Sequence, residues 1–399
     1  MAIGKVNGAA DTPYKTNETA EPDATLSHLD VSKLTVTLTE SPKALSAPET
    51  LRFGATFTDH MAVATFDPST GWSDPVIKPY GPLSLDPASS CLQYSSNCFE
   101  GMKAYLGPDG KARLFRPELN MRRLERSAER LALPPFDSNA ILELIKRLVQ
   151  VEKRWIPSLQ GYSLYIRPTI IGTRPALGVT ASDHAMLYVL TSPCGPYFPQ
   201  GLRAVSLLAI SDNVRAWPGG TGGHKVSGNY SPGFLPQRIA GKQGYDQVLW
   251  LFGEEKRVTE AGAMNFFVVV KRDDGNGHDF ITAPLDGTIL PGVTRASCLA
   301  LTRDPAFLEA ASLNLHPIER AYTIHDLVQW SAQGKLVEAL CIGTAAIVAS
   351  VNKIGYEGKN ITLPEYEAGL GPVGMALRQK ILGIQEGRDE YERWSVVCE

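Results

Sequence analysis

The 399-residue sequence lacks several features that would point to a membrane, nucleic-acid or metal role. No apolar run approaches a membrane span in length, and no signal-peptide core is present. The formal net charge of -3 argues against nucleic acid or an anionic membrane as the main partner. The histidines show no H-E-x-x-H pattern, so we predict no metal site. The cysteines show no C-x-x-C spacing, which indicates neither a disulfide framework nor a zinc knuckle; they are Cys91, Cys98, Cys194, Cys298, Cys341 and Cys398.

Arginine is also absent from residues 1–49, which are rich in small, polar and acidic residues. This composition predicts a disordered N-terminal tail over 1–49 and is a poor match to a mitochondrial transit peptide, so we expect a cytoplasmic location. The remaining length suits two domains. A Pro- and Gly-rich stretch predicts a linker over 193–203, between a smaller α/β domain over 50–192 and a larger α/β domain over 204–399.

Hydrophobic periodicity predicts the elements that carry the candidate site. Apolar residues at helical spacing predict helices over 117–131 and from Ser138 onward. Residues 162–171 are typical of a strand, so Tyr165 and Arg167 point to the same face. A hydroxyl beside a guanidinium can bind a carboxylate, but a surface arginine beside a packing tyrosine explains these two residues equally well.

The stretch 219–230 places Lys225 among glycines, with Tyr230 five residues later. Such a backbone can lie close to a bound group, and a lysine there can act as an amine nucleophile toward an aldehyde. A solvated lysine is the plain alternative. A nucleotide-binding P-loop is a second alternative, but His224 separates the glycine from the lysine and Val226 stands where Ser or Thr would bind magnesium.

Three further segments carry polar groups at turns. Glu260 lies between two predicted strands, 247–252 and 264–270, where it can reach a pocket or be solvated in a hairpin. Pro291-Gly292 precedes a predicted helix over 294–302, whose first N–H groups suit a phosphate, although Thr294 could simply cap the helix. A later turn over 343–345 offers more amides and the hydroxyl of Thr344.

An amine in a glycine loop, a carboxylate at a turn and a phosphate-type helix terminus are the parts that a pyridoxal phosphate site needs. The residues of these motifs and their order along the chain resemble those of the branched-chain amino acid aminotransferases, which are fold type IV pyridoxal phosphate enzymes. The resemblance extends from about Phe53 to the C-terminal end. The motifs that carry it are Phe53-Gly54, Phe57-Thr58-Asp59-His60-Met61, Phe99-Glu100-Gly101-Met102-Lys103, Arg116-Pro117, Asn120-Met121, Tyr165-Ile166-Arg167-Pro168, Gly228-Asn229-Tyr230, Glu260, Met264-Asn265, Leu290 to Arg295 and Gly343-Thr344-Ala345.

The resemblance implies a role for each candidate residue. Lys225 would bond the cofactor and move the proton, Glu260 would pair with the ring nitrogen, and Tyr230 would bind the ring's 3-oxygen. The phosphate would be held by Arg123, by the amides of Val293 and Thr294, and by Thr344. The substrate's α-carboxylate would meet Tyr94 and the amides of Ala263 and Ala345. An apolar side chain would meet Phe53, Phe99 and Tyr165, and Arg167 would accept the distal carboxylate of glutamate.

The resemblance also implies a mixed α/β (α+β), two-domain fold type IV architecture and a homodimer. The expected reaction moves an amino group from leucine, isoleucine or valine to 2-oxoglutarate. The donor stays open, because Ala263 and Cys341-Ile342 differ from the residues that eukaryotic relatives usually carry. The same fold also serves aminotransferases of specialised metabolism, aminotransferases for D-amino acids or amines, and aminodeoxychorismate-type lyases.

Overall fold

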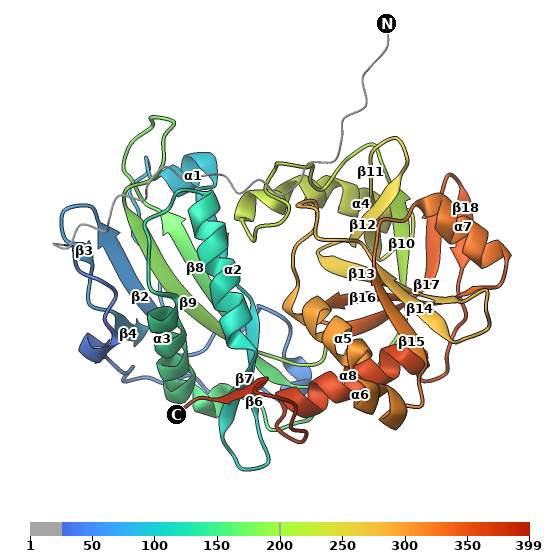
Figure 1. Cartoon of the computed structure of the whole chain (residues 1–399). Helices are drawn as coiled ribbons and strands as arrows, with labels where there is room; N and C mark the ends of the chain where they lie inside the picture. The colour runs from blue at the N-terminus through green and yellow to red at the C-terminus, as the bar shows by residue number, and fades with distance from the viewer. Residues whose placement is uncertain (1–25, 199–200) are drawn as a thin grey trace, which may run out of the picture.

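The computed structural model describes residues 26–198 and 201–399, which form two sheets that lie side by side in Figure 1. The first sheet is built mainly from the N-terminal half of the chain and the second from the C-terminal half. This arrangement confirms the predicted mixed α/β fold class. Residues 1–25, half of the predicted tail, lie outside the described residues.

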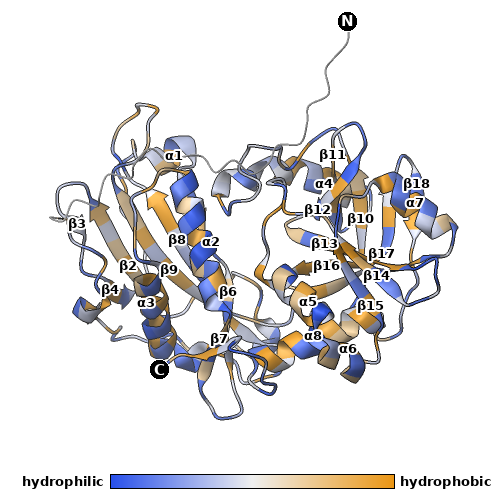
Figure 2. Cartoon of the chain, in the orientation of Figure 1, coloured by the Kyte–Doolittle hydropathy of each residue, from blue (hydrophilic) through white to orange (hydrophobic). Residues whose placement is uncertain are grey.

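The first sheet is largely antiparallel, with strand order β1-β4-β2-β9-β8-β6-β7-β19 and with β3 and β5 paired to β2 and β8. Its central strands are rich in β-branched and aromatic residues, which fit a pleated, buried surface. Figure 2 accordingly shows β2, β8 and β9 largely in the hydrophobic colours. The strands are β1 (Thr35–Val36), β2 (His60–Asp67), β3 (Gly71–Trp72), β4 (Val76–Pro79), β5 (Asn97–Phe99), β6 (Met102–Leu106), β7 (Ala112–Phe115), β8 (Ser163–Gly172), β9 (Ala185–Cys194) and β19 (Ser395–Val397).

Two amphipathic helices, α2 (Pro117–Arg130) and α3 (Ser138–Val151), pack their apolar stripes into the core of the first sheet. In α3 the residues at i, i+3, i+4, i+7 and i+8 from Ile141 are all buried, as the spacing predicts. The Asp137 side chain caps α3 by accepting the N–H of Asn139. The shorter helices of this half are η1 (Val31–Lys33), η2 (Pro48–Thr50), α1 (Ser90–Tyr94) and η3 (Lys153–Trp155).

The second sheet contains a closed ring of six strands, because β12 pairs with β13 as well as with β11. Alternate side chains of β13 face opposite sides of the ring. Phe266 packs with the apolar residues of β10, β11 and β16, and its neighbour Phe267 packs against helices. The strands are β10 (Val205–Ile210), β11 (Gln247–Phe252), β12 (Arg257–Ala261), β13 (Met264–Lys271), β14 (His278–Thr282), β15 (Leu315–Glu319), β16 (Leu336–Gly343), β17 (Ile347–Tyr356) and β18 (Lys359–Thr362).

The helices of the second half pack around this sheet (Figure 1). The predicted boundaries of α5 agree with the structure to within one residue at each end. The helices are η4 (Ser227–Asn229), η5 (Ser231–Gly233), α4 (Phe234–Lys242), α5 (Val293–Arg303), α6 (Pro305–Ala310), α7 (Ile324–Ala332) and α8 (Pro372–Gln385). Within the described ranges, none of these helices combines the length and the apolar character that a membrane crossing requires.

Both ends of the described chain lie on the first sheet, which differs from the predicted boundaries. Residues 26–49 were predicted as tail, but Leu29 is buried in the first core and β1 pairs with β4. Near the other end, β19 pairs with β7, although the sequence assigned 204–399 to the second domain. Strand β9 also continues to Cys194, two residues into the predicted linker. These differences have one reason: short apolar stretches gain their burial from partners far away in the sequence.

Candidate active site

A cavity of about 660 Å³ is lined by residues from both halves of the chain. Every residue that the sequence singled out for the site lines it, with the exception of Tyr94. The predicted residues around it are Phe53, Phe99, Arg123, Tyr165, Arg167, Lys225, Tyr230, Glu260, Ala263, Val293, Thr294, Thr344 and Ala345. Residues far apart in the sequence, from Phe53 to Ala345, thus meet in one place.

Lys225 lies in the loop before η4, and its backbone is held by the first half of the chain. Its N–H donates to the hydroxyl of Ser127 on α2 at 2.8 Å, and its carbonyl accepts the N–H of Phe99 at 3.1 Å. The side-chain Nζ donates to the Tyr230 hydroxyl at 3.0 Å and lies 4.7 Å from the centre of the Phe99 ring. The amine is therefore aimed into the cavity between two aromatic rings, and the solvated alternative does not describe it.

Glu260 occupies the end of β12 and is 2% exposed. Its Oε1 accepts the Asn265 side-chain amide at 2.9 Å and the Leu290 N–H at 3.0 Å, while its Oε2 lies 2.5 Å from Nε of Arg215. Burial raises the pKa of Glu260 above its ordinary value, against the opposing effect of the Arg215 guanidinium. Lys225 is close enough to lower that pKa as well. The predicted turn position is therefore wrong: Glu260 belongs to strand β12, which presents a fixed, buried carboxylate to the cavity rather than a solvated one.

Arg123 lies on the buried face of α2 and donates from two nitrogens to Glu100, Nε to Oε1 at 2.6 Å and Nη2 to Oε2 at 2.8 Å. Its third nitrogen, Nη1, donates to the carbonyl of Pro291 at 3.0 Å. Burial lowers the pKa of Arg123, but Glu100 more than offsets this and holds that pKa above its ordinary value. The guanidinium is therefore charged and rigidly aimed beside the start of α5.

Helix α5 begins at Val293 behind Gly292, and among the described residues no side chain caps this end. The plain-cap role considered for Thr294 is thus not the one observed. The first amides of the helix line the cavity, where the helix dipole and free N–H groups favour an anion. A methyl group added at Gly292 would lie 2.1 Å from Oδ1 of Asn265, so only glycine allows this approach.

The turn over residues 343–345, between β16 and β17, forms another part of the lining. It is fixed from the first half of the chain, because the buried Lys103 donates from Nζ to the carbonyl of Ala345 at 2.9 Å. Burial lowers the pKa of Lys103. Thr344 and the N–H of Ala345 are consequently held at the cavity by a contact between the two halves.

An aromatic wall faces these polar groups. The Phe53 and Tyr165 rings meet edge to face with centroids 4.7 Å apart, and the Arg167 guanidinium lies 4.6 Å from the centre of the Phe99 ring. Arg167 Nη2 donates to the Tyr165 hydroxyl at 3.0 Å, while its buried Nε has no partner among the described residues. The wall therefore combines apolar surface with a guanidinium that can still bind an acid.

Tyr94 is the one predicted site residue that the structure leaves outside this cavity. It ends α1, is 43% exposed, and its hydroxyl pairs with the carbonyl of Leu177. Its neighbours on the surface include other exposed apolar side chains, such as Leu92 and Leu177.

Several residues that hold the site were not singled out by sequence reasoning. Glu100 and Asn265 stood in motifs that were noted, and their polar character within apolar stretches was the available signal. Arg215 had no such signal, because its partners Glu260, Gly222 and Thr288 lie far from it or in loops. Other unassigned lining residues are Gly101, Tyr197, Ser227, Phe234, Gln247, Met264, Leu290, Ile342 and Gly343.

The donor set of the cavity fits pyridoxal phosphate. Arg123, the α5 amides and Thr344 can hold a phosphate, Glu260 can pair with the ring nitrogen, and the amine of Lys225 can bond the aldehyde. Within residues 26–198 and 201–399, His, Cys, Asp and Glu side chains form no group of three that could hold a metal ion, and all six cysteines are free.

Comparison with known proteins agrees with this geometry. The family model described as amino-transferase class IV matches residues 97–354. The cytosolic branched-chain-amino-acid aminotransferase of Saccharomyces cerevisiae is 45% identical over 374 residues, 94% of this chain and 98% of the relative. The mitochondrial enzyme of Schizosaccharomyces pombe is 45% identical over 369 residues, 92% of this chain and 85% of the relative.

Among solved structures, the T.th. branched-chain amino acid aminotransferase complexed with N-(5'-phosphopyridoxyl)-L-glutamate aligns with a TM-score of 0.64. It is 26% identical and covers 85% of this chain and 98% of its own. The chain therefore belongs to the class IV aminotransferases and, within them, to the branched-chain amino acid aminotransferase family.

Proposed function

We propose that the protein transfers the amino group of a branched-chain L-amino acid to 2-oxoglutarate, giving the branched 2-oxo acid and L-glutamate. One observation carries the proposal: Lys225, Glu260 and Arg123 line the same cavity, in a chain 45% identical to enzymes named for this activity. The ligand named for the solved T.th. structure joins a phosphopyridoxyl group to L-glutamate, the amino acid that the proposed reaction forms.

Pyridoxal phosphate, when bound, supplies an electron sink for the substrate's α-carbon. The chain would supply the proton transfer: Nζ of Lys225, held at 3.0 Å from the Tyr230 hydroxyl, would take the proton from the substrate's α-carbon. Glu260, fixed by Arg215 and Asn265, would pair with the ring nitrogen. Arg123, Val293, Thr294 and Thr344 would hold the phosphate.

The aromatic wall accounts for two different substrates in one cavity. Phe53, Phe99 and Tyr165 surround an aliphatic side chain, and Arg167 with Tyr165 binds the distal carboxylate of glutamate or 2-oxoglutarate. The amides of Ala263 and Ala345 receive the α-carboxylate that both substrates share. Both substrates are therefore oriented alike at Lys225, while their side chains use different parts of the wall.

The protein acts as a homodimer in this proposal. Large apolar side chains are exposed on both halves, among them Tyr94, Leu177, Trp217 and Phe234, and Phe234 lines the cavity. Exposed apolar side chains that lie together mark an interface. Tyr94 lies outside the cavity of its own chain. In the proposed dimer it lies at the cavity of the second copy. Sedimentation or light scattering tests the dimer directly.

We propose further that the two halves are domains joined through residues 193–203, and that the protein is cytoplasmic. Trypsin then cuts after Arg203 before it cuts within either sheet; a first cut inside a sheet would contradict the boundary. The location rests on the arginine-free, acidic composition of residues 1–49, and the two yeast relatives are named cytosolic and mitochondrial. Imaging of a C-terminally tagged full chain tests it, and a mitochondrial signal would contradict it.

The reaction is tested by incubating the purified, cofactor-loaded protein with L-leucine and 2-oxoglutarate. We expect L-glutamate and the branched 2-oxo acid in equal amounts, with L-isoleucine and L-valine also accepted. Glutamate formation only with aromatic or D-amino acid donors would contradict the proposed substrate class. Release of pyruvate from aminodeoxychorismate, without glutamate formation from any of these donors, would favour the lyase reaction instead.

A further inference from the structure

Residues 44–56, called here the Phe53 loop, connect the N-terminal segment to β2 and bring Phe53 into the substrate cavity. Phe53 is 54% exposed, and its ring packs edge to face against Tyr165. Inside the loop, Leu51 is buried, but most other residues are exposed, and its hydrogen bonds are local. Apart from the burial of Leu51 and the cavity that part of the loop lines together with residues 154–159, the loop is held at its two ends.

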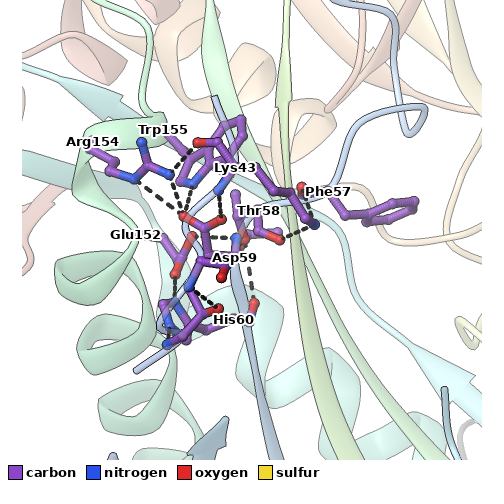
Figure 3. Close-up of polar contacts among 11 residues, drawn as sticks. Lys43, Phe57, Thr58, Asp59, His60, Glu152, Arg154 and Trp155 are labelled. Atoms are coloured by element: carbon purple, nitrogen blue, oxygen red, sulfur yellow. Dashed lines mark hydrogen bonds and ion pairs between the residues drawn. The ribbon is translucent and has the colours of Figure 1, made fainter. Parts of the chain in front are cut away.

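The two ends of the loop are joined by Lys43. Its backbone N–H donates to Oδ1 of Asp59 at 2.9 Å, which ties the residue before the loop to a residue just after it (Figure 3). Its side-chain Nζ reaches across and donates to the carbonyls of Phe57 and Thr58, at 3.1 and 2.9 Å. Nζ also lies 4.9 Å from the centre of the Tyr80 ring, on which Phe57 stacks.

Asp59 is the centre of this junction, and its side chain is 3% exposed. Its Oδ2 accepts from Nη2 of Arg154 at 2.5 Å and from Nε1 of Trp155 at 2.9 Å, and Arg154 also donates to the carbonyl of Lys43 at 2.7 Å. Burial raises the pKa of Asp59, but the hydrogen bonds from Lys43, Arg154 and Trp155 lower it more, so the pKa lies below its ordinary value.

A second pair of buried groups supports Asp59 from behind. The backbone N–H of Asp59 donates to Oε2 of Glu152 at 3.0 Å, and Oε1 of Glu152 pairs with Nδ1 of His60 (Figure 3). Nε2 of His60 accepts the N–H of Thr39 at 2.9 Å, so the histidine carries its proton on Nδ1. The segment before the loop is thus attached at residues 39 and 43, both times to the start of β2.

We propose that Lys43 and Asp59 are positioning residues that close the base of the Phe53 loop and thereby set the wall that Phe53 gives to the substrate cavity. Neither residue touches the cavity. Opening the base lengthens the free segment and lets Phe53 leave Tyr165, which weakens binding of the aliphatic side chain while Lys225 and its chemistry stay unchanged. The effect on substrate rests on the proposed function, whereas the closure of the loop does not.

The closure is tested by hydrogen–deuterium exchange of the cofactor-loaded protein. Lys43→Met keeps the aliphatic chain but removes Nζ, and Lys43 is exposed, so the fold tolerates the change. Lys33→Met is the matched control: Lys33 lies on the same segment and has only an exposed pair with Asp74 at 3.8 Å. We expect faster exchange confined to peptides from 44–56 in Lys43→Met, and wild-type exchange in Lys33→Met.

The effect on substrate is measured as the KM and kcat for each substrate. In Lys43→Met we expect the KM for L-leucine to rise about three- to tenfold with kcat within about twofold of wild type, the pattern of lost uniform binding. Asp59→Asn, in which an amide replaces the acceptor for Arg154 and Trp155, gives a larger rise. Where Asp59→Asn does not fold, Lys43→Met alone decides.

Unchanged exchange in 44–56, or an equal increase over the whole first sheet, would overturn the closure. Faster exchange with an unchanged KM for L-leucine would overturn the role of the loop in the cavity wall. If the wild-type protein does not use leucine at all, the proposed function fails, and the exchange data still decide whether Lys43 closes the loop.

Discussion

Glu100 and Arg123 form a buried ion pair with two parallel hydrogen bonds, of 2.6 and 2.8 Å, directly beside the cavity. Glu100 is fully buried, and it also accepts from the Asn120 side chain at 2.8 Å and from the N–H of Gly101 at 3.1 Å. With four donors around one carboxylate, the pair is well compensated for its burial. The carboxylate fixes the direction of the guanidinium that faces the start of α5.

Replacing Glu100 by glutamine weakens cofactor binding. The amide accepts fewer hydrogen bonds and faces the Arg123 N–H groups with donors of its own, so the guanidinium turns away from the phosphate end. We expect the Kd for pyridoxal phosphate to rise about tenfold, equal to about 1.4 kcal/mol. Titration of the apoprotein followed by fluorescence measures it. Glu125→Gln, at an exposed position of α2, is the control, and equal affinities of both variants would contradict the account.

The same pair makes stability depend on acid pH. Burial raises the pKa of Glu100, but Arg123 outweighs it and the pKa lies below its ordinary value. A carboxyl with a lowered folded-state pKa stabilises the protein above the unfolded-state pKa of about 4.3, and this contribution is lost as the pH falls through the folded-state pKa. Wild type should exceed Glu100→Gln by about 3 kcal/mol in free energy of unfolding at pH 7. The difference should shrink below about pH 4. A difference independent of pH would mean that Glu100 contributes packing alone.

Arg167→Ala should slow the half-reaction with 2-oxoglutarate more than the half-reaction with L-leucine. The change removes the guanidinium beside Phe99 and Tyr165 but leaves the apolar wall. A charge-assisted hydrogen bond contributes about 1.5–3 kcal/mol, so kcat/KM for 2-oxoglutarate should fall roughly ten- to a hundredfold. The value for L-leucine should change less than about threefold. Arg174→Ala, in the loop after β8, is the control. Equal losses for both substrates would mean that Arg167 only supports the wall.

The position of Tyr94 predicts complementation between two inactive variants. If Tyr94 reaches the cavity of a second copy, each active site combines Lys225 of one chain with Tyr94 of the other. Tyr94→Ala and Lys225→Ala then damage contributions from different chains. After the two are mixed and allowed to exchange subunits, half of the dimers have one intact site, which gives about a quarter of wild-type activity. No recovery, with subunit exchange shown independently, would place Tyr94 outside the reaction.

Local rules predicted the parts of the fold that depend on neighbours in sequence. The stripe of α3, the strand with Tyr165 and Arg167, and the break at Pro291-Gly292 before α5 all follow from periodicity or from the conformational limits of Pro and Gly. Most of the site was likewise predicted, because its residues stand in motifs that the family resemblance connects to one cofactor. The roles of those residues remain predictions.

Other parts of the fold depend on contacts between segments that are far apart in the sequence and that no local pattern predicts. The segment 26–49 is rich in polar residues, yet Leu29 is buried against the first sheet, and β19 reaches β7 from the opposite end of the chain. Arg215 contacts Glu260 from a loop with no local signal of its own. Tyr94 was assigned to the site from the family resemblance, which does not say whether the contact forms within one chain or between two.

The visible absorption of the cofactor-loaded protein tests the central claim most directly. We predict that L-leucine removes the yellow absorption and that 2-oxoglutarate then restores it, and that Lys225→Ala shows neither change. A yellow protein that does not respond to L-leucine, L-isoleucine or L-valine would contradict branched-chain transamination and move the activity to another amine donor or to elimination.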